Sequence, residues 1–389
     1  MNWIVSELFF PDEVSTAHII TEIALKKIDN EQLSVICGPS GYEKTYNSQI
    51  KELDSRIKVY RVRLPKLDKN KLFHRFIMQL ILTIKMGWMI LIKVKKGNKV
   101  LITTNPSFLL IVIYFLKKII EFKLEILVHD VFPDNLLPIG LLKKNTLKYE
   151  FLNKIYNLSY QCADRIIVLG EDMRRLMLEK ISPNYIKIDI VPNWAEDNIR
   201  PLENFNITEY LELDVKDKIV FGFAGNLGRL QGLLEFIDLF LLSNNQNIVL
   251  IIIGDGAMRG FIEKKIKNLN NIFYLGPKPR HEQNFFLNAC DIGVITLIKG
   301  MKGLGVPSKT YNLMAAGKPI FYIGDEESEI DNYINKYSCG WSFSWTKREY
   351  IIFFLNQIST SHLYDIQKKG NNSFLASLNY TKNKIINLI

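Results

Sequence analysis

The chain has 389 residues, of which 48% are hydrophobic and 23% are charged. This composition excludes an intrinsically disordered protein and is sufficient for two domains of ordinary size. The formal net charge of +10 favours a polyanionic or membrane-surface partner, and the four cysteines, scattered without metal-type spacing, are typical of reduced cytosolic thiols.

Buried strands alternate with apolar-periodic helices along the first half of the chain. We predict strands at 2–10, 33–37, 57–62, 99–103, 124–128, 165–169 and 186–191. We predict helices at 17–27, 107–120, 146–163 and 171–180, the first with Ser15 or Thr16 as its N-cap. This alternation indicates a parallel sheet covered on both faces, and ligands bind at the carboxyl ends of such strands. One edge should therefore carry segments 10–16, 103–106, 129–134 and 170–172.

Residues 61–99 combine a basic charge with apolar and aromatic side chains. Asp68 is the sole acid of this region, and Trp88 lies within its long apolar stretch at 72–92. Charged residues such as Lys85 interrupt that stretch, so we do not predict a membrane span. We predict an interface helix that attracts anionic lipid headgroups; a core helix with a solvated basic face is the alternative. No nucleic-acid recognition motif accompanies the charge, and no signal peptide is predicted, so we expect a cytoplasmic protein, peripheral on the inner face of the cytoplasmic membrane.

The alternation restarts after a polar stretch at 195–218, which is typical of a linker or surface excursion. We predict further strands at 219–223, 247–253, 272–275, 291–297 and 320–323. The sequence thus predicts two Rossmann-like domains, an N-terminal one at 1–193 and a C-terminal one at 194–371. We expect their strand-end loops to face each other across a cleft.

Two loops of the second half are suited to binding phosphate. One leads into a helix that starts near Ser308, where free N–H groups, a partial positive charge and Lys309 favour an anion. In the loop at 225–228, glycines let backbone N–H groups approach an anion closely, and Arg229 is suited to chelating a phosphate. An ordinary βα junction and a tight turn are the alternatives. The segment at 254–260 is only a weak dinucleotide fingerprint, because its last glycine comes one residue late.

Several segments, spread over nearly the whole chain, resemble those of one known family. They lie at 10–18, 128–133, 165–173, 191–194, 224–229, 253–256 and 306–319. The chain is similar to the retaining glycosyltransferases of family 4, and within them to bacterial surface-polysaccharide enzymes such as the WbuB-like N-acetyl-fucosamine transferases. The resemblance implies an α/β protein of the GT-B fold, with two Rossmann-like domains facing each other across a cleft. It also implies a C-terminal helix at 372–389 that crosses back to pack on the first domain.

The resemblance implies where each substrate binds. A nucleotide-sugar donor, expected to be a UDP-sugar, would contact Ser15, Thr16, Gly225, Asn226, Gly254, Gly256, Lys278, Pro279, Arg280, Pro307, Ser308 and Asn312. A lipid-linked (polyprenyl diphosphate) saccharide acceptor would contact Glu13, His18 and Asp134. Catalysis would fall to His129, Asp130, Arg229 and Lys309. Because the leaving phosphate takes the acceptor proton in such enzymes, the resemblance implies neither a protein nucleophile nor a metal or other cofactor, and catalysis rests on charge stabilisation and alignment.

The chain departs from the family pattern at residues that matter for the donor. Many members carry an Arg and a Lys where this chain has Asn226 and Gln231, and a glutamate pair where it has Leu304 and Asn312. We expect Arg229 to replace the missing charge and Asn312 to bond a ribose hydroxyl. The predicted reaction moves an N-acetylated hexose or deoxyhexose during O-antigen, capsule or related polysaccharide synthesis. The alternatives are a GT-B sugar-nucleotide epimerase and an inactive membrane-associated partner protein.

Overall fold

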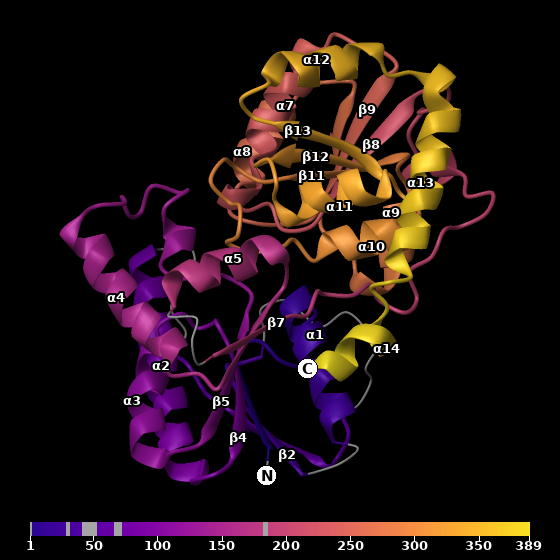
Figure 1. The fold of residues 1–389 in the computed structure, drawn as a ribbon. Coiled ribbons are helices and arrows are strands. Elements are labelled where there is room, and N and C mark those ends of the chain that lie inside the picture. The colour runs from indigo at the N-terminus through magenta and orange to yellow at the C-terminus, as the bar shows by residue number, and fades with distance from the viewer. Residues whose placement is uncertain (1, 29–31, 41–52, 66–71, 182–185) are drawn as a thin grey trace. The chain divides into compact units, whose positions relative to one another are not determined.

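The computed structural model describes residues 2–28, 32–40, 53–65, 72–181 and 186–389, and it divides the chain into two compact units (Figure 1). The first unit comprises residues 1–192 together with 303–305 and 388–389. The second comprises residues 193–302 and 306–387. Each unit has its own parallel sheet with helices on both faces, which is the GT-B architecture.

The first unit is built on a seven-stranded sheet of order β3-β2-β1-β4-β5-β6-β7, in which all described pairings are parallel. Its strands are β1 (Asn2–Ser6), β2 (Leu33–Cys37), β3 (Ile57–Arg61), β4 (Lys99–Thr103), β5 (Lys123–Val128), β6 (Arg165–Val168) and β7 (Lys187–Ile190). The strand order reverses between β1 and β4, where the loops that follow the two strands diverge. Ligands of doubly wound sheets bind at such a switch point, so the carboxyl ends of β1, β4 and β5 define the site edge of this unit.

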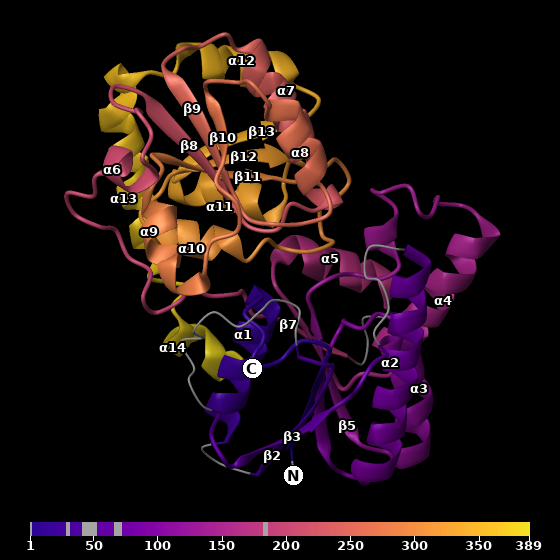
Figure 2. The same ribbon diagram turned by 180° about the vertical axis from the view of Figure 1, so that it is seen from behind.

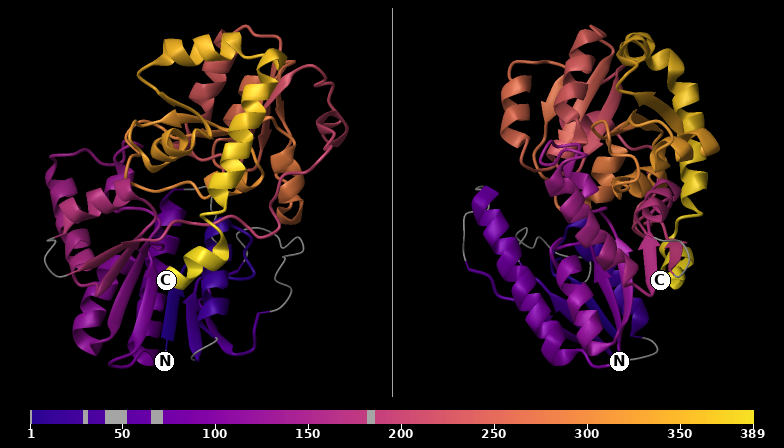
Figure 3. Two further views of the ribbon diagram at one scale, coloured as in Figure 1. Left: turned by 45° about the vertical axis from the view of Figure 1, so that its right-hand side comes forward. Right: turned by 60° about the vertical axis from the view of Figure 1, so that its left-hand side comes forward.

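The helices of the first unit are α1 (Ser15–Lys27), α2 (Leu72–Lys93), α3 (Leu109–Ile120), α4 (Leu147–Gln161) and α5 (Glu171–Lys180). Helices α2, α3 and α4 lie side by side on one face of the sheet, and α1 covers the other (Figures 1 and 3). Neither Ser15 nor Thr16 is the N-cap that we expected. Helix α1 already starts at Ser15, and Val14 stands at the cap position without a side-chain hydrogen bond.

Helix α2 is long and apolar enough to span a membrane by length and composition, yet it packs as a domain helix. Leu82, Met86 and Ile90, spaced by one helical turn, are buried against the rest of the unit. A Cβ on Gly87 would lie 2.8 Å from Val112 of α3, so the missing side chain permits the close approach of α2 and α3. The opposite side of α2 leaves large apolar side chains exposed, among them Trp88.

The second unit is built on a parallel sheet of order β10-β9-β8-β11-β12-β13. Its strands are β8 (Ile219–Ala224), β9 (Ile248–Ile253), β10 (Ile272–Tyr274), β11 (Ile292–Thr296), β12 (Ile320–Gly324) and β13 (Gly340–Ser344). Alternate residues of each strand face opposite helical layers. Phe221 and Phe223 pack with α7 (Leu233–Leu242), α8 (Arg259–Ile266) and α12 (Arg348–Gln357). Val220 packs on the other side with α6 (Ile207–Leu211) and residues next to α9 (Gln283–Asn288). Figure 2 shows α6 and α9 on the opposite side of this sheet from α7 and α8.

The remaining helices of the second unit are α10 (Lys309–Ala315), α11 (Glu329–Tyr337), α13 (Leu363–Ser377) and α14 (Lys382–Ile385). Helix α13 lies against α10, and a Cβ on Gly370 would stand 2.4 Å from the carbonyl oxygen of Gly317. The tail is not the single helix expected at 372–389, because α13 ends at Ser377 and α14 covers only Lys382–Ile385; packing of the tail on the first domain stays a prediction. Residues up to 387 belong to the second unit, and only Leu388 and Ile389 belong to the first. There the carbonyl of Leu388 accepts a 2.6 Å hydrogen bond from Arg165.

Candidate functional site

The two predicted phosphate loops meet at the carboxyl-end edge of the second sheet. The loop that contains Gly225 follows β8, and Lys309 opens α10. The Cδ atom of Lys309 lies 3.7 Å from the position that a Cβ of Gly225 would take. Its Nζ lies 3.5 Å from the ring centroid of Phe223, at the end of β8. Segments 84 residues apart in the sequence are therefore in contact, as the phosphate interpretation requires.

Lys309 carries a buried ammonium group for which the described part of the chain supplies no hydrogen-bond partner. The face of Phe223 offers only a cation–π contact. Burial lowers the pKa of Lys309 to about 7, far below that of a solvated lysine. Burying an unpaired charge is costly, and an arriving anion would both pair the ammonium and restore its proton. This geometry suits a phosphate group better than it suits a structural role.

Gly254 and Gly256 pack against the backbone of the 225–228 loop, and neither position has room for a side chain. Gly254 has φ +136°, and a Cβ there would lie 1.9 Å from the carbonyl oxygen of Gly225. A Cβ on Gly256 would lie 2.6 Å from the carbonyl oxygen of Leu227. Backbone hydrogen bonds join the same two segments, from the Leu227 N–H to the carbonyl of Asp255 at 2.8 Å. Both glycines are thus explained by loop packing, and a direct donor contact for them stays a prediction.

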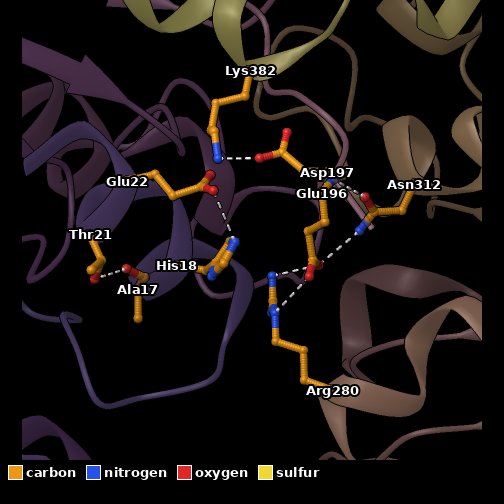
Figure 4. A network of polar contacts seen from close by, with 9 residues as sticks. All are labelled: Ala17, His18, Thr21, Glu22, Glu196, Asp197, Arg280, Asn312 and Lys382. Atoms are coloured by element: carbon orange, nitrogen blue, oxygen red, sulfur yellow. Dashed lines mark hydrogen bonds and ion pairs between the residues drawn. The ribbon is translucent and has the colours of Figure 1, made fainter. Parts of the chain in front are cut away.

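Arg280 and Asn312, both predicted to contact the donor, are held by a residue that we had not singled out. Glu196, only 5% exposed, accepts hydrogen bonds from Arg280 Nη2 at 2.7 Å and from Asn312 Nδ2 at 3.3 Å (Figure 4). The Asn312 Oδ1 atom accepts the Glu196 backbone N–H at 3.0 Å. The amide of Asn312 is therefore engaged on both sides, rather than open to a ribose as expected. Glu196 belongs to the polar stretch at 195–218 that we interpreted as a linker, and a charged residue in such a stretch gives no signal of burial.

The other predicted donor residues of the second unit line the same edge. Asn226 and Lys278 are exposed, and Pro279 is half-buried in the loop after β10. Arg229 is exposed at the start of a short 3-10 segment. Pro307 and Ser308 are half-buried before α10, and Ser308 stands at its N-cap position without using its side chain as a cap. Their contacts with a donor stay a prediction.

At the site edge of the first unit, His129 and Asp130 directly follow β5 and are fixed to the end of β4. Both backbone N–H groups donate to Thr104 Oγ1 at 3.2 Å, and Asn105 Nδ2 donates to Asp130 Oδ2 at 3.4 Å. Thr104 and Asn105 lie in the predicted strand-end segment at 103–106, but their clamping role was not predicted. Residues 303–305 also belong to this unit. A Cβ on Gly305 would lie 2.9 Å from the His129 carbonyl oxygen.

His129 is neutral at physiological pH. Burial lowers its pKa to about 4, and its Nε2 atom is buried without a hydrogen-bond partner among the described residues. A neutral imidazole is able to donate or accept one hydrogen bond at that nitrogen, depending on its tautomer. Burial likewise raises the pKa of Asp130. The pair therefore offers a neutral hydrogen-bonding group beside a carboxyl group, a combination suited to the hydroxyl groups of a sugar.

The predicted acceptor residues are less available than expected. Asp134 is buried, accepts a 2.7 Å hydrogen bond from Tyr149 and forms an ion pair with Lys180. Its carboxylate thus has a structural role, and the expectation that it orients an acceptor hydroxyl is not supported by this geometry. His18 Nε2 lies 3.4 Å from Glu22 on the same helix. Glu13, Ser15 and Thr16 are half-buried around the start of α1.

Among the described residues, no group of three or more His, Cys, Asp or Glu side chains is arranged to hold a metal ion.

The two α/β units and their strand-end loops define a protein of the GT-B fold, and comparison with solved structures agrees. HepE of Anabaena, solved in complex with UDP, superposes with a TM-score of 0.71 at 16% identity, covering 100% of this chain and 98% of that one. WaaG, a glycosyltransferase involved in lipopolysaccharide biosynthesis, superposes with a TM-score of 0.68 at 10% identity, covering 100% and 98%. At these identities the likeness shows the fold alone.

The family follows from the sequence comparisons. Residues 211–349 match the family model described as glycosyl transferases group 1. WbjE of Pseudomonas aeruginosa, described as a probable glycosyltransferase, is 37% identical over 288 residues, which are 72% of this chain and 70% of that protein. The chain belongs to the group 1 glycosyltransferases.

Proposed function

We propose that this protein transfers a sugar from a UDP-sugar to a lipid-linked saccharide during synthesis of a bacterial surface polysaccharide. The observation that carries the donor half of the proposal is the buried, unpaired ammonium of Lys309 beside the 225–228 loop. That arrangement favours an anion, and a nucleotide diphosphate supplies one. HepE, which shares the fold, has been solved with UDP and with UDP-glucose, which supports a uridine nucleotide.

In the proposed reaction, the bond between the anomeric carbon and the donor phosphate breaks while a bond to the acceptor oxygen forms on the same face. The acceptor proton passes to the leaving diphosphate, so the anomeric configuration is retained and neither a protein nucleophile nor a metal takes part. Lys309, with Arg229 directly after the 225–228 loop, stabilises the charge that develops on the diphosphate. The neutral imidazole of His129 and the carboxyl group of Asp130 hold the hydroxyl groups of the sugar in position for transfer. The donor sugar is an N-acetylated hexose or deoxyhexose.

The lipid-linked acceptor and the membrane location are supported by the outer face of α2 and α3. Large apolar side chains are exposed there: Phe76, Ile84, Trp88, Leu91, Ile92, Phe115 and Ile119. Basic residues, including Lys85, Lys95 and Lys96, are exposed on or just after α2. Apolar side chains edged by lysines match the interface of an anionic bilayer. The protein would thus act at the inner face of the cytoplasmic membrane.

The test is a panel of UDP-, GDP- and dTDP-sugars, incubated with the full chain in the presence and absence of a polyprenyl diphosphate saccharide. We expect transfer, or slow hydrolysis without acceptor, from UDP-linked sugars only, with retained configuration by NMR. Conversion of the donor to an epimer in the absence of acceptor would show that the protein is a sugar-nucleotide epimerase instead. Neither turnover nor nucleotide binding would contradict the proposal altogether.

A further inference from the structure

The first unit contains an apolar cavity of about 550 Å³. It is separate from the site edge that the carboxyl ends of β1, β4 and β5 define. It lies between the end of β3 and the helices α2 and α3, and Val62, Leu91, Val112 and Leu116 contribute to its apolar wall. Its volume falls in the range of about 300–1,000 Å³ that is usual for ligand pockets. Trp88, 63% exposed, belongs both to this wall and to the exposed apolar face of α2. The cavity therefore adjoins the surface that we place against the membrane.

Three cationic residues accompany the apolar wall. Arg61, Arg63 and Lys85 all line the cavity, and Arg63 and Lys85 are exposed. Lys85 Nζ donates to the carbonyl oxygen of Arg63 at 2.8 Å, which places the ammonium group beside the backbone of Arg63. An apolar chamber with clustered positive charge fits an amphiphile that has a hydrocarbon chain and an anionic head.

Arg61 also connects the cavity to the site edge of the same unit. Its guanidinium donates to the carbonyl oxygens of Phe10 and, at 3.3 Å, of Gly38. Phe10 lies in the loop after β1, and Gly38 directly follows β2. A head group held at Arg61 would thus stand next to the carboxyl ends of the strands, where ligands of such sheets bind.

We propose that the cavity holds the first isoprene units of a polyprenyl diphosphate acceptor, with the diphosphate against Arg61, Arg63 and Lys85. This inference rests on the proposed function, and it names the part of the acceptor that this unit recognises. Three clustered cations match two adjacent phosphates better than the single phosphate of a membrane phospholipid. A cavity of about 550 Å³ has room for the first isoprene units of a single chain.

The probe is farnesyl diphosphate, titrated by calorimetry into the full chain in mild detergent. Leu91→Trp narrows the cavity and Arg63→Glu reverses a charge beside it, and we expect each change to weaken binding at least tenfold. Ile92→Trp is the matched control, because Ile92 is 60% exposed on the same helix and is not among the lining residues. Its affinity should equal that of the wild type, and Lys309→Ala should also leave farnesyl diphosphate binding unchanged.

Two further probes separate the sources of binding. Inorganic diphosphate should bind much more weakly than farnesyl diphosphate, and short-chain phosphatidylglycerol should not compete with it. Equal binding of phosphatidylglycerol, or farnesyl diphosphate binding that survives both Leu91→Trp and Arg63→Glu, would overturn the inference. UDP titrated into the same preparations reports separately on the donor half of the proposed function. UDP binding without farnesyl diphosphate binding refutes the cavity alone, whereas the reverse result supports the cavity and contradicts the proposed donor.

Discussion

Lys309 places an ammonium group where the described part of the chain gives it no partner. If Lys309 binds an anionic ligand, its unpaired ammonium group should destabilise the ligand-free protein. We therefore expect Lys309→Met to raise the free energy of unfolding of the second unit by about 1–3 kcal/mol at pH 7, because an apolar side chain replaces an unpaired buried one. The same change should abolish UDP binding. Thermal unfolding measures the change in stability, and calorimetry measures UDP binding.

Lys264 is exposed on α8 and provides the control for this prediction. Lys264→Met should change stability by no more than about 0.5 kcal/mol and leave UDP binding intact. A destabilised Lys309→Met protein that still binds UDP would show that Lys309 is structural.

The depressed pKa of Lys309 also predicts a pH dependence of donor binding. In the free protein this pKa is about 7, and a bound diphosphate should raise it, because the anion favours the charged form. Above pH 7 binding then requires uptake of a proton, so affinity should fall by up to tenfold per pH unit. A UDP-sugar is the appropriate ligand, because its diphosphate does not titrate in this range. Lys309→Arg should give pH-independent affinity; a wild-type affinity that is constant from pH 7 to 9 would contradict the account.

His129 should contribute to acid unfolding. Burial lowers its pKa to about 4, against about 6.5 in the unfolded chain. Below pH 6.5 the unfolded state therefore binds the extra proton, so stability is lost as the pH falls from 6.5 to 4, by up to about 3 kcal/mol. His129→Gln should flatten this part of the stability profile, measured by urea unfolding at a series of pH values. An unchanged slope would mean that His129 titrates normally in the folded protein.

At the scale of elements, the sequence was sufficient wherever one segment determines its own structure. Parallel strands buried on both faces give continuous apolar runs such as that at 248–253, and these runs predicted both sheets. The strand-end loops followed, since parallel strands share one carboxyl edge. Contacts between distant segments were not predictable in this way. Glu196 meets Asn312 across 116 positions, and Asp134 meets Lys180 across 46. Nothing local to either carboxylate indicates that it is buried and paired.

Helix α2 leads to a prediction about the membrane. Lys95 and Lys96 are exposed just after it. Lys95→Glu combined with Lys96→Glu should reduce binding to vesicles rich in phosphatidylglycerol by about tenfold or more, since each basic residue near an anionic surface is worth about 1 kcal/mol. Cosedimentation measures this binding. Lys264→Glu with Lys267→Glu, in the second unit, makes the same change in net charge and should have little effect. Equal loss from both pairs would indicate a general charge effect rather than a docking face.

At the scale of the whole molecule, two units with separate sheets divide the chain close to the predicted boundary, at Pro192. The tail was harder to place from the sequence, because an amphipathic helix does not reveal which surface it covers. Helix α13 proves to cover α10, the helix that Lys309 opens. The membership of the group 1 glycosyltransferases and the fold define the class of chemistry, and the two loops that we predict to bind phosphate are consistent with it. The net charge of +10 is consistent with a nucleotide diphosphate donor and an anionic surface.

The central claim is that Lys309 and the 225–228 loop bind the diphosphate of a UDP-sugar. A structure of the protein determined with UDP tests it most directly. The account predicts a phosphate oxygen within hydrogen-bond distance of Lys309 Nζ and of backbone N–H groups in the 225–228 loop. A diphosphate bound elsewhere, with the Lys309 ammonium still unpaired, would contradict it.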